Sequence, residues 1–216
     1  MAGSRVSVDE GLEAYLDRLL APDPQVAGLL AENADDPWAR MMTHPDLGRL
    51  LAILVRATGG RRVLEVGTFV GVSATWMARA LAPGGRVDTI EVDPERADRA
   101  EAWFRRAGLA DRITVHRGPG EAVLPGLPDG AYDLAYIDAD KTGYPEYLDH
   151  AVRLVRAGGL VVADNVLAGG DVGRPESEDS ERVAALRAFT AAALADPRLE
   201  TTVLAVGDGV TLSAVR

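Results

Sequence analysis

The stretch VLEVGTFVGVS, residues 63–73, decides the fold of this chain. A short and mainly apolar run, 63–66, ends at Gly67, and a helical pattern begins at Val72. Nearly continuous apolar strands are typical of parallel sheets that carry helices on both faces. Glycines directly after such a strand allow a tight turn and let the backbone approach a ligand closely. The stretch therefore predicts the first strand, loop and helix of an α/β domain.

The same alternation continues along the chain and predicts a doubly wound, mostly parallel, seven-stranded sheet. The last two strands flank Gly207-Asp208-Gly209, which indicates an antiparallel hairpin at the end of the chain. Expected strands cover 63–66, 87–92, 113–116, 134–138, 160–163, 201–206 and 210–215, and expected helices cover 72–81, 94–107, 144–155 and 180–195.

The region before residue 59 has a helical pattern instead. Asp23-Pro24 has the cap-then-proline pattern that opens a helix. Thr43 with Asp46 resembles a capping box for a third helix. We expect one domain over 1–216, made of a helical N-terminal cap, 1–58, and an α/β core, 59–216. The apolar residues that predict the first helix, and a face that needs a partner, are Val8, Leu12, Leu16 and Leu19.

Composition excludes several classes of protein. The 216 residues include 23 basic and 33 acidic side chains, a formal net charge of -10, so a nucleic-acid partner is not expected. The chain has no cysteine, which excludes disulfides and thiolate metal sites. No apolar run is long enough to cross a membrane, and the first residues lack the apolar stretch of a signal peptide. We expect a cytoplasmic protein with a small-molecule partner.

Acidic residues at the ends of the first two strands indicate a nucleotide-type cofactor. Glu91 ends the second strand, where an acid accepts hydrogen bonds from ribose hydroxyls, and Asp93 before Pro94 is expected to cap the next helix. Glu65 could hold the amino-acid part of a cofactor. Phe69 occupies the second glycine position of the G-x-G-x-x-G motif, which counts against a nicotinamide or flavin dinucleotide. Together these features favour S-adenosylmethionine.

Hard oxygen ligands follow the fourth and fifth strands. Asp138 ends the fourth strand, and the pair Asp164-Asn165 ends the fifth. Ligands bind at the carboxyl ends of strands in such sheets, so these side chains should converge. Oxygen-only ligation suits Mg²⁺, Mn²⁺ or Ca²⁺ and disfavours Zn²⁺. The alternative is that these acids only cap helices or occupy turns, but Lys141 close by favours a site.

Histidine and tryptophan give weaker signals. His44, His116 and His150 show no metal-ligand spacing, and we expect surface or packing roles for them. Of the three tryptophans, Trp38 is the best candidate to line a cavity.

With these residues in place, the sequence resembles the cation-dependent O-methyltransferases of the caffeoyl-coenzyme A and catechol type. The resemblance covers nearly the whole chain. It rests on Met41-x-Thr43 before Gly48, Leu64-Glu65-Val66-Gly67, Thr89-Ile90-Glu91, Asp138-Ala139-Asp140-Lys141 with Tyr144, Asp164-Asn165 and the closing Gly207-Asp208-Gly209-Val210-Thr211-Leu212.

The resemblance implies a role for each matched residue. Lys141 would be the general base or would assist deprotonation, and Asp138, Asp164 and Asn165 would bind the metal. Members are often homodimers. The implied S-adenosylmethionine site consists of Met41, Thr43, Glu65, Gly67, Thr68, Ser73, Glu91, Gly120 and Asp138.

The expected activity is transfer of a methyl group from S-adenosylmethionine to a hydroxyl of a small vicinal diphenol, with Mg²⁺ as the first choice of cation. Plant enzymes acting on coenzyme A esters tend to carry a tryptophan where this chain has Ala168, and the acidic charge suits a bulky anionic thioester poorly. A methyltransferase for another acceptor, such as a hydroxamate or an amine, is the alternative within enzymes. A non-catalytic S-adenosylmethionine-binding protein and a nicotinamide dehydrogenase are the others.

Overall fold

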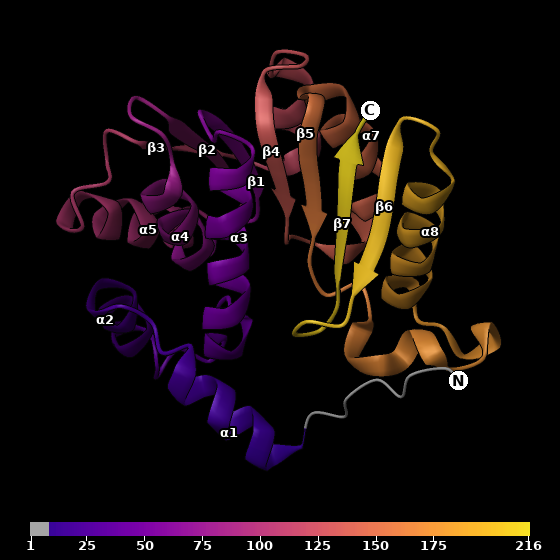
Figure 1. Ribbon diagram of the computed structural model, residues 1–216, viewed down its shortest axis with the longest axis horizontal. Helices are drawn as coiled ribbons and strands as arrows, with labels where there is room; N and C mark the ends of the chain where they lie inside the picture. Colours follow the sequence, from indigo (N-terminus) through magenta and orange to yellow (C-terminus); the bar gives the residue numbers. More distant parts are fainter. Residues whose placement is uncertain (1–8) are drawn as a thin grey trace.

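Seven strands form one sheet in the order β3-β2-β1-β4-β5-β7-β6 in the computed structural model, which describes residues 9–216 (Figure 1). The first five strands run parallel, and β7 lies antiparallel between β5 and β6. This confirms the predicted doubly wound sheet with its antiparallel C-terminal hairpin. The strands are β1 (Arg62–Val66), β2 (Arg86–Glu91), β3 (Ile113–Arg117), β4 (Tyr132–Ile137), β5 (Val155–Ala163), β6 (Leu199–Leu204) and β7 (Val210–Val215).

Helices cover both faces of the sheet. The α-helices are α1 (Glu10–Leu19), α2 (Pro24–Glu32), α3 (Pro45–Ala57), α4 (Val72–Ala80), α5 (Pro94–Arg106), α6 (Gly120–Val123), α7 (Tyr144–Leu154) and α8 (Glu181–Ala195). Short 3₁₀ turns are η1 (Ala39–Met41), η2 (Leu124–Gly126), η3 (Lys141–Gly143), η4 (Ala168–Gly173) and η5 (Glu176–Glu178). None of the helices described over residues 9–216 has the length and apolar character needed to span a membrane.

The alternation of side chains along each strand builds two separate cores. Val63 and Tyr136 pack with residues of α2 to α5 on one face. Leu64 and Ile137 pack with residues of α7 and α8 on the other. Because successive residues of a strand point to opposite faces, every central strand must be apolar on both sides. This explains why the strand signal in the sequence is a continuous apolar run.

Helix starts follow the predicted caps, with one exception. The carboxylates of Asp23 and Asp93 accept backbone N–H bonds at the starts of α2 and α5, each followed by proline. The capping box predicted from Thr43 is wrong. His44 occupies the cap position of α3 without a side-chain bond, because Pro45 must take the first helical position, and Asp46 instead accepts from the ring of His44. Val8 lies outside the described residues.

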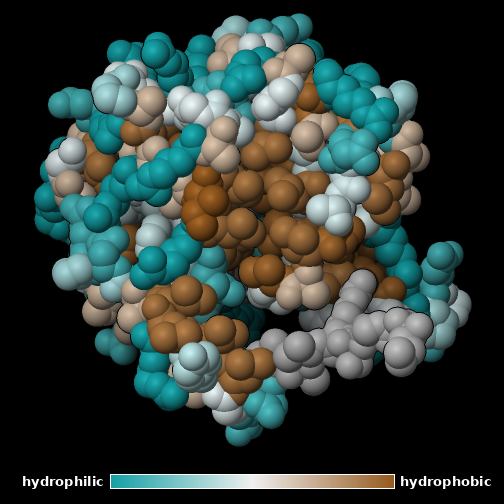
Figure 2. Space-filling view, in the orientation of Figure 1, coloured by the Kyte–Doolittle hydropathy of each residue, from teal (hydrophilic) through white to brown (hydrophobic). Residues whose placement is uncertain are grey.

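One face of the C-terminal half of the sheet carries no helix. Leu160 of β5 and Leu212 of β7 are only partly buried there, and Ile53 of α3 is 61% exposed. Figure 2 shows a broad hydrophobic surface in this region, between α3 and the strands β5 and β7 of Figure 1. We call this surface the open sheet face and define it by Ile53, Leu160, Leu204 and Leu212. The N-terminal helix α1 also buries none of its side chains.

Candidate functional site

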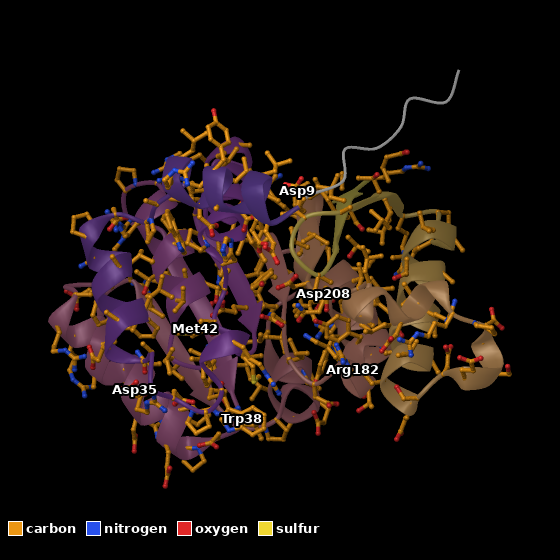
Figure 3. The ribbon with its side chains drawn as sticks, turned by 90° about the horizontal axis from the view of Figure 1, so that it is seen from below. Asp9, Asp35, Trp38, Met42, Arg182 and Asp208 are labelled. Atoms are coloured by element: carbon orange, nitrogen blue, oxygen red, sulfur yellow. The ribbon has the colours of Figure 1, made fainter. Side chains whose placement is uncertain are left out.

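A cavity of about 960 Å³ lies at the carboxyl ends of the parallel strands. Figure 3 looks onto this end of the sheet, with Met42 and Trp38 on the side of the N-terminal elements and Arg182 and Asp208 on the other. The order of the sheet reverses between β1 and β4, which is where the crevice of a doubly wound sheet is expected. The cavity is lined by residues that follow β1, β2 and β3 at one end and by residues that follow β4, β5 and β6 at the other.

The loop after β1 depends on Gly67. Its φ of 99° belongs to the region that glycine tolerates, and a Cβ atom there would overlap the carbonyl oxygen of Asp138. Phe69, with φ of 50°, is one of three non-glycine residues with positive φ among those described. Its N–H donates to Oε2 of Glu91 at 2.7 Å. The loop is therefore held in place by the acid at the end of β2.

Glu91 is a carboxylate oriented by the backbone. Its Oε1 accepts from the N–H of Asp93 at 2.9 Å, so each oxygen of the group has a main-chain donor. The residue is 5% exposed and lines the cavity. Such an arrangement leaves further lone pairs directed at a ligand, as a ribose-binding acid requires.

Glu65 lies behind the cavity wall. It is fully buried and does not line the cavity, unlike the other predicted cofactor residues. Thr89 donates to Oε2 of Glu65 at 2.5 Å, and the hydroxyls of Thr89 and Thr68 lie 2.6 Å apart. Oε1 has no hydrogen-bond partner among the described residues. Burial raises the pKa of Glu65 to about 8, so the carboxyl is largely protonated at neutral pH. A line of hydroxyls thus connects it to Thr68 on the cavity surface.

The ends of β4 and β5 bring two carboxylates together. The backbone hydrogen bonds of the sheet continue one residue past each strand. The N–H of Asp138 donates to the carbonyl oxygen of Val66, and the N–H of Asp164 donates to that of Ile137. The hydroxyl of Tyr136 lies 3.5 Å from Oδ2 of Asp138 and 3.3 Å from Oδ2 of Asp164. Burial, followed by the charge of Asp138, raises the pKa of Asp164 to about 7. A divalent cation fits here, because it would offset the repulsion between two carboxylates that share one hydroxyl donor.

The ligand set available for such a cation is small. Asn165 follows Asp164 in a left-handed turn with φ of 58° and also lines the cavity. Over residues 9–216, no three side chains of histidine, cysteine, aspartate or glutamate are grouped as a metal site. Two carboxylates and one amide are all hard oxygen donors, and they leave half of an octahedral shell to other ligands.

Lys141 is fixed beside the carboxylates. Its Nζ donates to Oδ1 of Asp138 at 2.8 Å and to the hydroxyl of Tyr144 at 2.8 Å. The hydroxyl of Tyr144 in turn donates to the carbonyl oxygen of Asp164 at 2.9 Å. Tyr144 is fully buried, so one hydroxyl connects the lysine to the end of β5. The amine is thus aimed at the cavity between the two strand ends.

The structure brings nearly all the predicted site residues to one cavity. His44, for which we expected a surface or packing role, lines the cavity on the side of the N-terminal elements. Trp38, the tryptophan expected to line the cavity, is not among its residues and is 48% exposed. The predicted residues that line the cavity are Met41, Thr43, Gly67, Thr68, Ser73, Glu91, Gly120, Asp138, Lys141, Asp164 and Asn165.

Several residues at the site were not anticipated. Tyr136 lies two positions before Asp138 and therefore on the same face of β4, a relation that strand alternation could have revealed. Tyr147 packs its ring against Gly120, where a Cβ atom would lie 2.8 Å from the ring. Arg182 and Asp208 line the far end of the cavity but come from α8 and the β6–β7 hairpin. No local pattern in the sequence connects those two residues to the strand ends.

Known proteins resemble this chain along almost its whole length. A family model described as O-methyltransferase matches residues 21–215. A catechol O-methyltransferase of Mycobacterium tuberculosis is 40% identical over 95% of this chain and 95% of the relative. A putative O-methyltransferase of Mycolicibacterium smegmatis is 38% identical over 96% of this chain and 97% of its own length.

Solved structures agree with the sequence matches. The O-methyltransferase from Bacillus cereus in complex with SAH superposes with a TM-score of 0.86, at 34% identity, and covers 95% of this chain and 97% of its own. The O-methyltransferase TomG from Streptomyces achromogenes, in complex with SAM, has a TM-score of 0.83 at 33% identity, with coverage of 95% and 96%.

Proposed function

This chain belongs to the O-methyltransferase family, and we propose that it methylates one hydroxyl of a vicinal diphenol with the help of a divalent cation. The observation that carries this proposal is the pair of neighbouring carboxylates, Asp138 and Asp164, next to the amine of Lys141. A catechol O-methyltransferase among the relatives supports the choice of acceptor.

The half of the cavity at β1 and β2 would hold the methyl donor. S-Adenosylmethionine, when bound, supplies a methyl group on a sulfonium that is a good leaving group. Glu91 would accept from the ribose hydroxyls, since backbone N–H groups already orient its carboxylate. Glu65 lies behind the cavity wall, so it would influence donor binding only through the hydroxyls of Thr89 and Thr68. The other proposed donor-site residues are Met41, Thr43, Gly67, Ser73, Gly120 and Asp138.

The half of the cavity at β4 and β5 would hold the acceptor. A divalent cation, preferably Mg²⁺, would be held by Asp138, Asp164 and Asn165 and, when bound, would favour ionisation of a neighbouring hydroxyl. Lys141 would take the hydroxyl proton at Nζ. The bonds from Nζ to Asp138 and Tyr144 fix its position, so the amine and the acceptor oxygen meet at a defined place.

Two adjacent hydroxyls suit this half because the three protein ligands leave several coordination positions open. A plain phenol can fill only one of these coordination positions, so its reacting oxygen is held in a less defined orientation. Misplacing a reacting atom by about an ångström can cost on the order of a hundredfold in rate. The acceptor geometry is therefore the most direct test of the proposal.

The experiment compares catechol with plain phenol, using a labelled methyl donor and product analysis. We expect catechol to give a mono-methyl ether at least about a hundredfold faster than phenol reacts. Chelation should abolish turnover, added Mg²⁺ should restore it, and Asp164→Ala should behave like the chelated enzyme. Equal rates for the two acceptors, or full activity after chelation, would overturn the cation-assisted mechanism.

We propose the homodimer as the working assembly, formed through the open sheet face. Leu160 and Leu212 are only partly buried there, and Ile53 exposes most of its side chain. Exposed apolar surface of this kind marks a contact site. We also propose a cytoplasmic location.

A further inference from the structure

The cavity extends beyond the proposed cation site. Past Asn165, its wall is formed by Gly207 and Asp208 of the β6–β7 hairpin and by Arg182 of α8. In Figure 3, Arg182 and Asp208 lie on the same side of the opening. An acceptor whose hydroxyls lie at the carboxylates would direct the rest of its ring toward this end.

The guanidinium group of Arg182 is only weakly engaged by the protein, and its side chain is 50% exposed. Among residues 9–216 it makes no hydrogen bond, and its nearest ionic partner is Oδ2 of Asp208 at 3.9 Å. Asp208 itself accepts from the N–H of Gly169 at 2.5 Å. Arg156 provides a contrast, because its guanidinium donates to Asp133 at 2.7 Å and to the carbonyl of Thr58 at 2.9 Å. Arg182 therefore brings unused donors to a cavity wall.

Charge divides this half of the cavity into two ends. The reacting end carries the carboxylates of Asp138 and Asp164 together with the amine of Lys141, a set that suits hydroxyls and a cation. The far end carries Arg182 beside Asp208, and the planar fork of N–H groups on Arg182 matches a carboxylate in a bidentate manner. The two ends together fit a molecule with hydroxyls on one side and a negative charge on the other.

We infer that Arg182 is a specificity-determining residue that binds the carboxylate of an acidic vicinal diphenol. This inference rests on the proposed function, because it assumes that the diphenol hydroxyls lie at Asp138 and Asp164. In this role Arg182 would select the acceptor and would take no part in the proton transfer.

The experiment compares 3,4-dihydroxybenzoate with its methyl ester, which keeps the ring hydroxyls and removes the negative charge. The wild type should show at least about a tenfold higher kcat/KM for the acid, the scale of one charge-assisted contact. Affinity of both compounds in the presence of S-adenosylhomocysteine, measured by calorimetry, should show the same preference without turnover. A preference for the coenzyme A thioester of the acid over the acid itself would overturn the inference.

Variants assign the preference to this residue. Arg182→Ala should bring the ratio of kcat/KM for the acid to kcat/KM for the ester close to one. Arg182→Lys should give a ratio between those of the wild type and Arg182→Ala, because lysine keeps the positive charge but lacks the planar pair of N–H donors. Asp208→Asn, which removes the competing charge and keeps an oxygen for Gly169, should increase the ratio. Arg105→Ala is the matched control, since Arg105 is 63% exposed on α5 and does not line the cavity.

The outcomes separate this inference from the proposed function. Methylation of catechol and of both test compounds at similar rates overturns the role of Arg182 alone. An unchanged acid-to-ester ratio in Arg182→Ala, with an unchanged affinity for S-adenosylhomocysteine as proof of folding, does the same. No turnover of any vicinal diphenol by the wild type overturns the proposed function, and the inference with it.

Discussion

At the scale of single residues, the hydroxyl of Tyr144 joins two parts of the site that come from different strands. It receives a hydrogen bond from Nζ of Lys141 and donates one to the carbonyl of Asp164. We expect Tyr144→Phe to lower kcat by about tenfold or more while leaving the KM for the methyl donor nearly unchanged, because Lys141 would lose one of the two hydrogen bonds that fix its position.

Steady-state kinetics with each substrate varied in turn checks this expectation. Tyr15→Phe is the control, because Tyr15 is 50% exposed on α1. A change confined to the donor KM would show that Tyr144 supports the cofactor half instead. A kcat equal to that of the wild type would show that Lys141 needs no support.

Glu65 predicts a pH dependence of stability. Its folded pKa of about 8 lies above the ordinary value of 4.5, so between these two values the folded protein retains a proton that the unfolded chain releases. The contribution of Glu65 to the free energy of unfolding therefore falls as the pH rises through this window, by up to about 1.4 kcal/mol per pH unit. Above pH 8 the contribution is constant at its lowest level.

Urea unfolding of the wild type and Glu65→Gln between pH 5 and 9 tests this. We expect the variant to gain stability relative to the wild type as the pH rises, since glutamine cannot ionise. Parallel stability curves for the two proteins would mean that Glu65 keeps an ordinary pKa.

Residues directly after strands could be predicted from the sequence, and residues brought in from elsewhere could not. Asp138, Asp164 and Asn165 lie at the carboxyl ends of β4 and β5, where the topology alone directs them to one edge. Glu65 was expected at the cofactor, yet its side chain is fully buried on one face of β1 behind the wall. Arg182 depends on how α8 packs, a relation between distant segments that no local pattern encodes.

At the scale of elements, the turn between β1 and α4 is the most demanding feature. Gly67 combines φ of 99° with a backbone so close to Asp138 that a methyl group would overlap it. Gly67→Ala should therefore lower the free energy of unfolding by well over the 1–2 kcal/mol or so that a left-handed backbone alone costs, and it should also weaken binding of S-adenosylhomocysteine.

The control at this scale is Gly84→Ala. Gly84 has φ of 76° but no atom within 4 Å of an added Cβ, so it carries only the conformational cost. Denaturant unfolding of both variants separates overlap from backbone strain. Equal losses of stability would mean that the loop shifts away from Asp138 without difficulty.

Element boundaries show where local signals give way to packing. Asp23 and Asp93 cap their helices as expected, because in each case the capping side chain directly precedes a proline and both residues favour a helix start at the same position. At α3 the two signals disagree, and the fixed φ of Pro45 decides the start of the helix over the side chain of Thr43. β5 begins at Val155, five residues earlier than expected. Val155 pairs with Tyr132 of β4, and a register shift then separates this pair from the regular pairing that starts at Leu160. The apolar pattern of the sequence shows only the regular part.

At the scale of the whole molecule, the open sheet face predicts the assembly state. Ile53→Glu places a charge on the proposed dimer contact, where burial of an unpaired carboxylate is costly. We expect this variant to be monomeric at concentrations at which the wild type is a dimer, measured by sedimentation velocity. Leu194→Glu, on α8 and 57% exposed, should leave the assembly unchanged. A dimer that survives Ile53→Glu would place the contact elsewhere, and a monomeric wild type would exclude it.

The reversal of strand order between β1 and β4 has a consequence for how the enzyme acquires activity. Glu91 and Gly67 lie far from Asp138 and Asp164 in the chain, and β2 and β3 stand in the sequence between β1 and its neighbour β4. Contacts between such distant segments form slowly, because a long loop must close first. During refolding, far-ultraviolet circular dichroism should therefore recover before fluorescence-detected binding of S-adenosylhomocysteine does. We expect the cavity to form late in folding, so that recovery of ligand binding would report on a late step.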